Sequence, residues 1–220
     1  MDMTPQRWNF LEEYSREVFG NQDDHLAGLM VDAVNRGLPD IAVSPEVGRL
    51  LMMLTCMTPG RLALEVGTLG GYSGIWIARG LPPEGRLMTV ESEPTHAAFA
   101  REQFKRAGVE SRVEIMEGKA MEVLPELHKK LGDHALDLVF LDAVKVEYPD
   151  YWKLVRPMIR EGGIIVADNV YGSGWTIDQI DDPTRQQVDQ FNRLVAGDPD
   201  FEAIAIPLRS GVLVGRRMRG

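Results

Sequence analysis

The feature that most constrains the fold is the alternation of short apolar segments with helical patterns between residues 61 and 168. The segments are "RLALEVG", "RLMTVE", "RVEIMEG", "LDLVFLD" and "GGIIVAD", and residues with helical periodicity separate them. Strands that alternate with helices of this length form right-handed βαβ units, in which the strands are parallel and helices cover both faces of the sheet. The pattern therefore predicts an α/β fold built on a mostly parallel sheet.

The two ends of the chain depart from this alternation. Apolar residues before residue 59 recur at helical spacing, so we expect residues 1–58 to form an N-terminal helical cap region and residues 59–220 a Rossmann-like core. A length of 220 residues fits one such domain. Near the C-terminus, a three-residue turn joins "FEAIAIPL" to "VLVGRR", which predicts an antiparallel hairpin at the edge of the sheet. The segment 170–183 is the one long loop, and loops of this length are often functional.

The composition limits the partners and the compartment. The net charge of −9 counts against a nucleic-acid or anionic-membrane surface, because such surfaces are bound by clusters of Lys and Arg. No apolar run approaches the roughly 20 residues that span a bilayer, and the N-terminus has no apolar leader. The single cysteine, Cys56, excludes an internal disulfide and fits a reducing environment. We therefore expect a cytoplasmic protein.

A glycine-rich loop, "LEVGTLGGYSG", follows the first expected strand and opens a helix. In open parallel sheets, ligands bind outside the carboxyl ends of the strands, where such loops lie. Gly67 would allow close approach of the backbone, and Gly70–Gly71 would permit a tight turn with positive φ. Leu69 stands where the dinucleotide motif G-x-G-x-x-G has its second glycine, which weakens the dinucleotide interpretation without excluding it.

Acidic residues end the first two of these strands. Glu65 could accept a hydrogen bond from an ammonium group, and Glu91 stands where an acid takes the ribose hydroxyl pair in nucleotide-binding sheets. Both could also be ordinary residues of strand-end turns. Taken with the glycine loop, they favour an adenosine-type cofactor with an unphosphorylated ribose.

Oxygen-bearing side chains end two further strands: Asp142 ends "LDLVFLD", and Asp168–Asn169 end "GGIIVADN". Acids and amides are common at turns, where they satisfy backbone N–H groups. However, the carboxyl ends of parallel strands lie at one edge of the sheet, so these side chains are expected in the same crevice as the glycine loop. Two carboxylates and an amide, without Cys or His, form a hard ligand set that suits Mg²⁺, Mn²⁺ or Ca²⁺.

Four stretches together resemble the cation-dependent O-methyltransferases that use S-adenosylmethionine, a family that includes catechol and caffeoyl-CoA O-methyltransferases. They are "LEVGTLGGYSGIWIARGLPPEGRLMTVE", "AGVESRVEIMEGKAMEVLPEL", "LDLVFLDAVKVEYPDYW" and "GGIIVADNV", and the resemblance covers roughly residues 40 to 170. It implies a class I methyltransferase fold with a seven-stranded sheet, and commonly a homodimer. It also implies metal ligation by Asp142, Asp168 and Asn169, and cofactor binding by Val43, Glu65, Gly67, Thr68, Ser73, Glu91, Ala120 and Asp142.

The chemistry expected from this resemblance is methyl transfer to a hydroxyl group of a small catechol-like aromatic. A divalent cation, most simply Mg²⁺, would lower the pKa of the acceptor hydroxyl. With Asp142 as a ligand, Lys145 is expected to act as the catalytic base or to stabilise the phenolate. Trp175, Tyr148 and Trp152 could form an aromatic wall, although Trp152 is more consistent with the core. The four histidines are scattered among charged residues and are expected at the surface.

Departures from the family pattern leave the acceptor open. Val144 stands where caffeoyl-CoA-type members often carry a second acid, Ser173 replaces a substrate-touching asparagine, and "PLRSG" replaces "P-x-G-D-G". Methylation of a hydroxylated tRNA base, with the same motifs, remains an alternative that the negative charge disfavours. A nicotinamide dehydrogenase is disfavoured by Leu69. A catalytically inert protein that binds S-adenosylmethionine is the non-enzymatic alternative.

Overall fold

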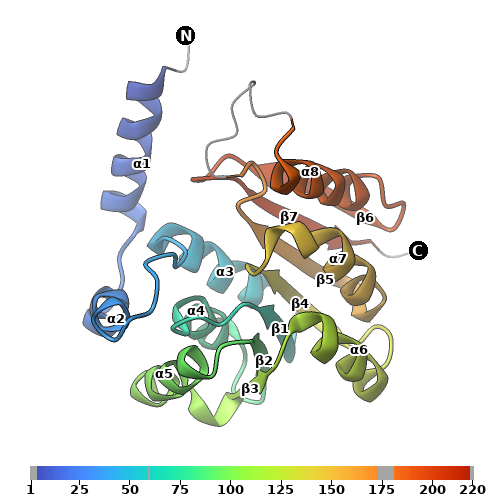
Figure 1. The fold of residues 1–220 in the computed structure, drawn as a ribbon, viewed down its shortest axis with the longest axis horizontal. Helices are drawn as coiled ribbons and strands as arrows, with labels where there is room; N and C mark the ends of the chain where they lie inside the picture. Colours follow the sequence, from blue (N-terminus) through green and yellow to red (C-terminus); the bar gives the residue numbers. More distant parts are fainter. Residues whose placement is uncertain (1–3, 59, 173–180, 219–220) are drawn as a thin grey trace.

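The computed structural model describes residues 4–58, 60–172 and 181–218, and a seven-stranded sheet forms its centre (Figure 1). The strand order is β3-β2-β1-β4-β5-β7-β6, in which β7 is antiparallel to both of its neighbours and the other pairs are parallel. The predicted α/β fold with an antiparallel hairpin edge is therefore confirmed. The strands are β1 (Leu62–Val66), β2 (Arg86–Glu91), β3 (Val113–Glu117), β4 (Leu136–Leu141), β5 (Ile159–Asp168), β6 (Phe201–Ile206) and β7 (Val212–Arg217).

Alternate residues of the central strands pack into two separate cores, as the two-residue period of a strand requires. In β4, Leu138 and Phe140 join the core under α2 to α5, whereas Val139 and Leu141 join the core under α6 to α8. Because both faces are covered, β4 is buried along its whole length. The helices are α1 (Pro5–Phe19), α2 (Asp24–Asn35), α3 (Pro45–Met57), α4 (Tyr72–Gly80), α5 (Pro94–Arg106), α6 (Ala120–Leu131), α7 (Tyr148–Val155) and α8 (Pro183–Ala196).

Strand β5 begins three residues before "GGIIVAD", the segment that the sequence indicated as a strand. Helix α7 ends at Val155, a 3₁₀ turn spans Arg156–Met158, and β5 begins at Ile159. Pro157 lies in that turn and has no N–H for a helical hydrogen bond, so the helix cannot continue through it. The strand is thus longer than "GGIIVAD", and its pairing with β4 shifts register between Leu136 and Leu138.

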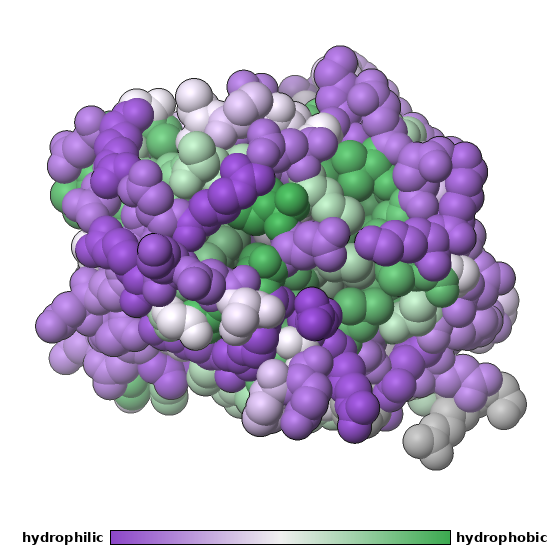
Figure 2. All heavy atoms as spheres, turned by 90° about the horizontal axis from the view of Figure 1, so that it is seen from below, coloured by the Kyte–Doolittle hydropathy of each residue, from purple (hydrophilic) through white to green (hydrophobic). Residues whose placement is uncertain are grey.

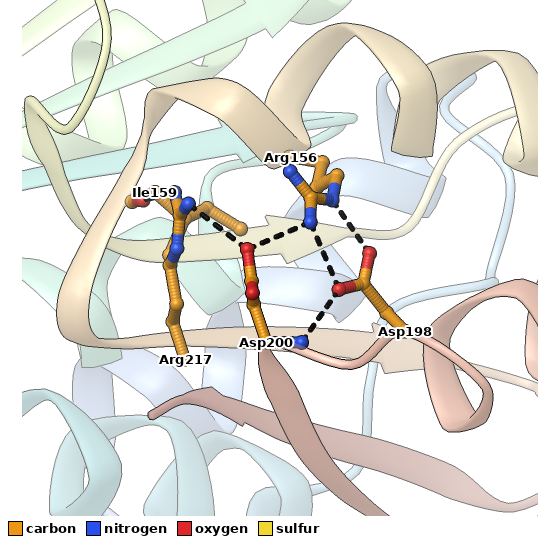
Figure 3. Close-up of polar contacts among 5 residues, drawn as sticks. All are labelled: Arg156, Ile159, Asp198, Asp200 and Arg217. Carbon is orange, nitrogen blue, oxygen red and sulfur yellow. Dashed lines mark hydrogen bonds and ion pairs between the residues drawn. The ribbon is translucent and has the colours of Figure 1, made fainter. Parts of the chain in front are cut away.

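An ion-pair network fastens this turn to the C-terminal hairpin (Figure 3). Arg156 binds Asp198 through two nitrogens, at 2.5 and 3.0 Å, and Asp200 at 2.8 Å. Arg217 binds Asp200 at 3.2 Å and donates to the carbonyl of Ile159 at 2.7 Å. Four charges from the turn after α7, from β7 and from the α8–β6 connection therefore hold the antiparallel edge against the parallel sheet.

The face seen from below Figure 1 is mostly hydrophilic, and apolar side chains are visible mainly in its recesses (Figure 2). Helix α1 extends away from the sheet (Figure 1), and none of its residues is buried. Across the described ranges, no helix has both the length and the apolar character needed to cross a bilayer.

Candidate functional site

A cavity of about 740 Å³ opens at the carboxyl ends of β1, β2 and β4. The chain runs outward from β1 to β2 and β3 on one side and from β4 to β5 on the other, so the cavity lies at the switch point of the sheet. Its walls are the glycine loop, the start of α5 and α6, the segment after β4, and residues 41–43 between α2 and α3. This is the position where ligands bind in open α/β sheets.

Gly67 brings the ends of β1 and β4 into contact beneath this cavity. Its φ is +102°, and a Cβ atom there would lie 2.2 Å from the carbonyl oxygen of Asp142. Its N–H donates to the carbonyl of Val90, while the N–H of Asp142 donates to that of Val66. The three strand ends are joined so closely that only glycine fits at this position.

Glu91, at the end of β2, organises the glycine loop through backbone amides. Its Oε2 accepts hydrogen bonds from the N–H groups of Thr68 at 3.2 Å and Leu69 at 2.7 Å, and its Oε1 accepts one from Glu93 at 3.0 Å. Leu69 has a φ of +47°, an uncommon conformation for a residue with a side chain. The carboxylate thus holds the loop in a shape that Leu69 would not favour alone.

Glu65 lies one layer beneath the cavity rather than on its wall. It has no exposed surface, and it accepts hydrogen bonds from Ser73 Oγ and Thr89 Oγ1, both at 2.6 Å. Burial raises the pKa of Glu65 to about 7, against the lowering effect of the two hydroxyl groups, and the charges of Asp142 and Glu91 raise it further. Ser73 stands between this carboxyl group and the cavity.

The oxygen-bearing residues after β4 and β5 lie beside one another. Asp142 and Asn169 line the cavity, and Asp168 is almost fully buried at the end of β5. Asn169 has a φ of +59°, which an asparagine adopts more readily than most residues. Burial, followed by the charge of Asp142, raises the pKa of Asp168 to about 6. The backbone N–H of Asn169 and the charge of Lys145 act in the opposite direction, but the Oδ1 atom of Asp168 is buried without a hydrogen-bond partner.

Lys145 connects the two strand ends. Its Nζ donates to Asp142 Oδ1 at 2.6 Å, to the hydroxyl of Tyr148 at 2.7 Å and to the carbonyl of Asp168 at 3.4 Å. The Tyr148 hydroxyl also lies 2.9 Å from the carbonyl of Leu141 and 3.2 Å from that of Asp168. Because Tyr148 is fully buried and packs edge-on against Phe191, its hydroxyl group is a rigid hydrogen-bond partner for Lys145.

Comparison with known proteins identifies the family of this chain. Residues 14–218 match the O-methyltransferase family. The catechol O-methyltransferase of Niastella koreensis is 36% identical over 207 residues, which cover 94% of this chain and 93% of that protein. The chain belongs to the O-methyltransferase family.

Two further relatives agree with this assignment. A catechol O-methyltransferase of Mycobacterium tuberculosis is 38% identical over 184 residues, covering 84% of this chain and 82% of that protein. The crystal structure of the O-methyltransferase TomG from Streptomyces achromogenes, in complex with SAM, superimposes with a TM-score of 0.86 at 35% identity. It covers 99% of this chain and 100% of that one. The family, the Rossmann-like methyltransferase fold and the enzyme class indicated by the four sequence motifs are thereby confirmed.

In this O-methyltransferase, most of the residues assigned to the cofactor from the sequence line one cavity. Glu65 is the exception, since it reaches the cavity only through Ser73. Lys145 also lines the cavity, together with two of the three proposed metal ligands. The cavity-lining members of the cofactor set are Val43, Gly67, Thr68, Ser73, Glu91, Ala120 and Asp142.

The expectation of an aromatic wall was partly wrong. Tyr148 lies in the core under α6 to α8 and not on a wall, whereas the core position favoured for Trp152 is confirmed. Trp175 and Ser173 lie outside the described residues. Tyr151, which the sequence analysis did not single out, lines the cavity instead, and its hydroxyl donates to Glu147. Tyr151 and Trp152 are neighbours on α7, and helical periodicity alone does not determine which of them reaches the cavity.

The expectation that all histidines are surface residues was also wrong. The side chain of His96 is only 20% exposed, it lines the cavity, and its Nδ1 lies 3.6 Å from Glu91 Oε1. Its position in the first turn of α5, five residues after the acid that ends β2, was the signal that could have located it, because that turn faces the crevice. His25 is partly buried as well and contacts Gln103 at 2.8 Å.

The ligand chemistry of the site fits a hard cation. Two carboxylates and one amide lie at the β4 and β5 ends, and the unpartnered Asp168 Oδ1 needs a positive partner. Among the described residues there is no group of three or more His, Cys, Asp or Glu side chains arranged to hold a metal. The proposed ligand set contains only two carboxylates, Asp142 and Asp168. Its third member is the amide of Asn169, so the set does not meet that definition.

Proposed function

We propose that the protein transfers a methyl group from S-adenosylmethionine to a hydroxyl group of a small catechol-like aromatic, with the help of a divalent cation. The observation that carries this proposal is the placement of Asp142 and Asn169 on the wall of the cavity, with the buried Asp168 carboxylate, whose Oδ1 has no hydrogen-bond partner, behind them. The names of two relatives, both catechol O-methyltransferases, support the acceptor class.

The glycine-loop half of the cavity is the proposed place of the cofactor, which supplies an electrophilic methyl group when bound. Glu91 holds the loop through the backbone amides of Thr68 and Leu69, and Ser73 presents a hydroxyl group that donates to Glu65. Gly67 lines this half of the cavity and lets the loop start directly against the end of β4. The complex of TomG with SAM supports this placement.

The β4–β5 half is the proposed place of the cation and the acceptor. Asp142, Asp168 and Asn169 would hold a divalent cation, which when bound lowers the pKa of a vicinal hydroxyl group and orients it. The carboxylates are hard oxygen donors. Burial, followed by the charge of Asp142, raises the pKa of Asp168, and a positive charge between the two carboxylates would offset both effects.

Lys145 would receive the proton that the acceptor hydroxyl loses, or stabilise the phenolate that forms. Its Nζ is oriented by Asp142, by the Tyr148 hydroxyl and by the Asp168 carbonyl, so it points to the same strand ends as the proposed cation ligands. A base held in this way contributes typically about 10²- to 10⁴-fold to the rate.

The decisive test is a methyl-transfer assay on a panel of small catechols with and without EDTA. We expect transfer to stop on chelation and to return with Mg²⁺. Asp142→Ala should abolish both activity and metal activation, and Lys145→Ala should lower kcat by at least about 10²-fold. Lys153→Ala is the matched control, because Lys153 is an exposed lysine on α7 that pairs only with its helical neighbour Asp150. Full turnover after chelation would contradict the proposal.

We also propose that the enzyme is a homodimer that uses α1. This helix carries a set of apolar side chains that are 41–64% exposed: Trp8, Phe10, Leu11, Tyr14, Val18 and Phe19. It also carries Glu12, Glu13 and Glu17, which an anionic membrane would repel. A second copy is therefore the favoured partner. Sedimentation equilibrium should give twice the chain mass, and Phe10→Asp should give a monomer; a monomeric native enzyme would contradict this.

A further inference from the structure

Arg209 occupies a strained position in the turn between β6 and β7. The N–H of Gly211 donates to the carbonyl of Leu208 at 3.0 Å, so Arg209 and Ser210 are the two central residues of a tight turn. Arg209 has a φ of +51°, and Ser210 is not among the residues with positive φ. Hairpin turns with positive φ at the first central position favour glycine there, because a Cβ atom is unfavourable in the left-handed region. A residue kept in such a conformation points to a role for its side chain.

The turn is fixed to the rim of the proposed acceptor site. The N–H groups of Val170 and Tyr171 donate to the carbonyls of Gly211 and Ser210, at 3.0 and 2.8 Å, directly after the cavity residue Asn169. A Cβ atom on Gly211 would lie 2.5 Å from the Tyr171 ring, so the turn packs tightly on this segment. The position of Arg209 relative to the β5 end is therefore well defined.

The guanidinium group of Arg209 contacts a residue of the cavity wall and has no acidic partner among the described residues. Its Nη1 lies 3.4 Å from the carbonyl of Ala42, and Ala42 lines the cavity. Within the described part of the chain, Arg209 forms no ion pair with a carboxylate, whereas Lys145 is occupied by Asp142. Arg209 is exposed, so its guanidinium has N–H donors available beside the cavity wall.

We propose that Arg209 binds a carboxylate on the methyl acceptor, so that the preferred substrates are catechol-like aromatic acids rather than neutral catechols or catechol amines. This proposal rests on the proposed catechol function and specifies its substrate class. Arginine recognises carboxylates through paired N–H donors, and a cation at this place would repel an ammonium group. The left-handed conformation then keeps an arginine where the turn itself would favour glycine.

The test compares 3,4-dihydroxybenzoate, its methyl ester and dopamine as acceptors for the full-length enzyme and for Arg209→Gly. In the native enzyme kcat/KM should fall in that order. In Arg209→Gly the value for the acid should fall about tenfold or more, which corresponds to about 1.4 kcal/mol. The value for the ester should stay within about twofold. Because glycine suits the turn, the thermal midpoint should stay equal or rise.

Two further variants separate recognition from structural tethering. Arg209→Glu should reverse the order, with dopamine preferred to the acid. Arg49→Gln is the matched control, since Arg49 also tethers a loop by donating to the backbone carbonyls of Phe19 and Asn21, and none of these three residues lines the cavity. Its acid-to-ester ratio should equal that of the native enzyme. An unchanged ratio in Arg209→Gly, or an equal loss for acid and ester with a lower thermal midpoint, would overturn the proposal in favour of a tether.

Calorimetric titration with 3,4-dihydroxybenzoate measures recognition of the acid by binding alone, without methyl transfer. Affinity should fall about tenfold in Arg209→Gly, the same loss as in kcat/KM. If no catechol is methylated while this difference in affinity persists, the proposed reaction fails and the recognition role stands. If catechols are methylated and neither affinity nor preference changes, the recognition role fails alone.

Discussion

Replacing Glu65 by glutamine should remove a specific pH dependence of stability. The carboxyl group is fully buried, and its pKa of about 7 lies about 2.5 units above the ordinary value of 4.5. At about 1.36 kcal/mol per unit, ionised Glu65 destabilises the folded protein by roughly 3 kcal/mol relative to the protonated form. Glutamine has nearly the same shape and is uncharged at every pH, so it reproduces the protonated state.

The sign follows from proton binding. Between pH 4.5 and 7 the folded protein holds the Glu65 proton that the unfolded chain has released, so the free energy of unfolding falls as pH rises through this window and is level above it. Glu65→Gln has no such titration. We therefore expect its stability advantage over the native protein to grow by most of about 3 kcal/mol between roughly pH 5 and pH 8.5.

Urea unfolding of both proteins at half-unit pH steps, followed by tryptophan fluorescence, measures this difference. Other titrating groups are common to the two proteins and cancel. Glu126→Gln is the control, because Glu126 is 72% exposed and its replacement should leave a curve parallel to the native one. Parallel curves for Glu65→Gln as well would refute the reasoning. If S-adenosylmethionine places its ammonium group near Ser73, saturating cofactor should also reduce the difference.

Three other perturbations test the framework of the site. Gly67→Ala places a Cβ atom 2.2 Å from a backbone oxygen and should lower the free energy of unfolding by more than about 3 kcal/mol. Gly108 also has positive φ but open space around it, so Gly108→Ala should lower it by only about 1–2 kcal/mol. Equal losses in urea unfolding would contradict this. Asp168→Asn should stabilise the cation-free protein at about pH 8, since the raised pKa means that its ionised form is unfavourable there, and should abolish activation by Mg²⁺; a lower thermal midpoint would argue against it. Arg156→Met leaves Asp198 without its bidentate partner and should lower stability by about 1–3 kcal/mol while kcat stays unchanged, a result checked by calorimetry and the methyl-transfer assay.

Sequence reasoning located the fold and the edge of the sheet that carries the site because both follow from periodicity. Apolar runs separated by helical patterns define the strands, and strands of a parallel sheet end at one edge, so Asp142 and Asn169 reach the same cavity. Side-chain depth does not follow from such patterns. Glu65 and Asp168 both end strands next to cavity residues, yet both are buried behind them, because the groups that cover them come from other elements.

The same limit explains the errors on α7 and α5. Tyr148 and Tyr151 lie within one turn of a single helix and both belong to the core under α6 to α8, but Tyr151 also lines the cavity, a difference that helical periodicity does not determine. His96 was judged by its charged neighbours in sequence, although its neighbour in space is Glu91. The connection between β2 and α5 brings these two residues together, a contact that their five-residue spacing could have indicated.

The four carboxyl groups near the strand ends, those of Glu65, Glu91, Asp142 and Asp168, show where the fold loses stability. Backbone amides neutralise Glu91, and hydroxyl groups together with a raised pKa accommodate Glu65. Lys145 pairs with Asp142, whereas Asp168 keeps an oxygen without a partner. An unsatisfied buried carboxylate is unfavourable, and a hydrophobic or amide side chain of similar size would remove the cost. The protein's own groups stabilise the other three carboxyl groups, so the open oxygen of Asp168 is best explained by a partner from outside the chain. A hard cation is the kind of partner that a carboxylate beside another carboxylate and an amide would bind.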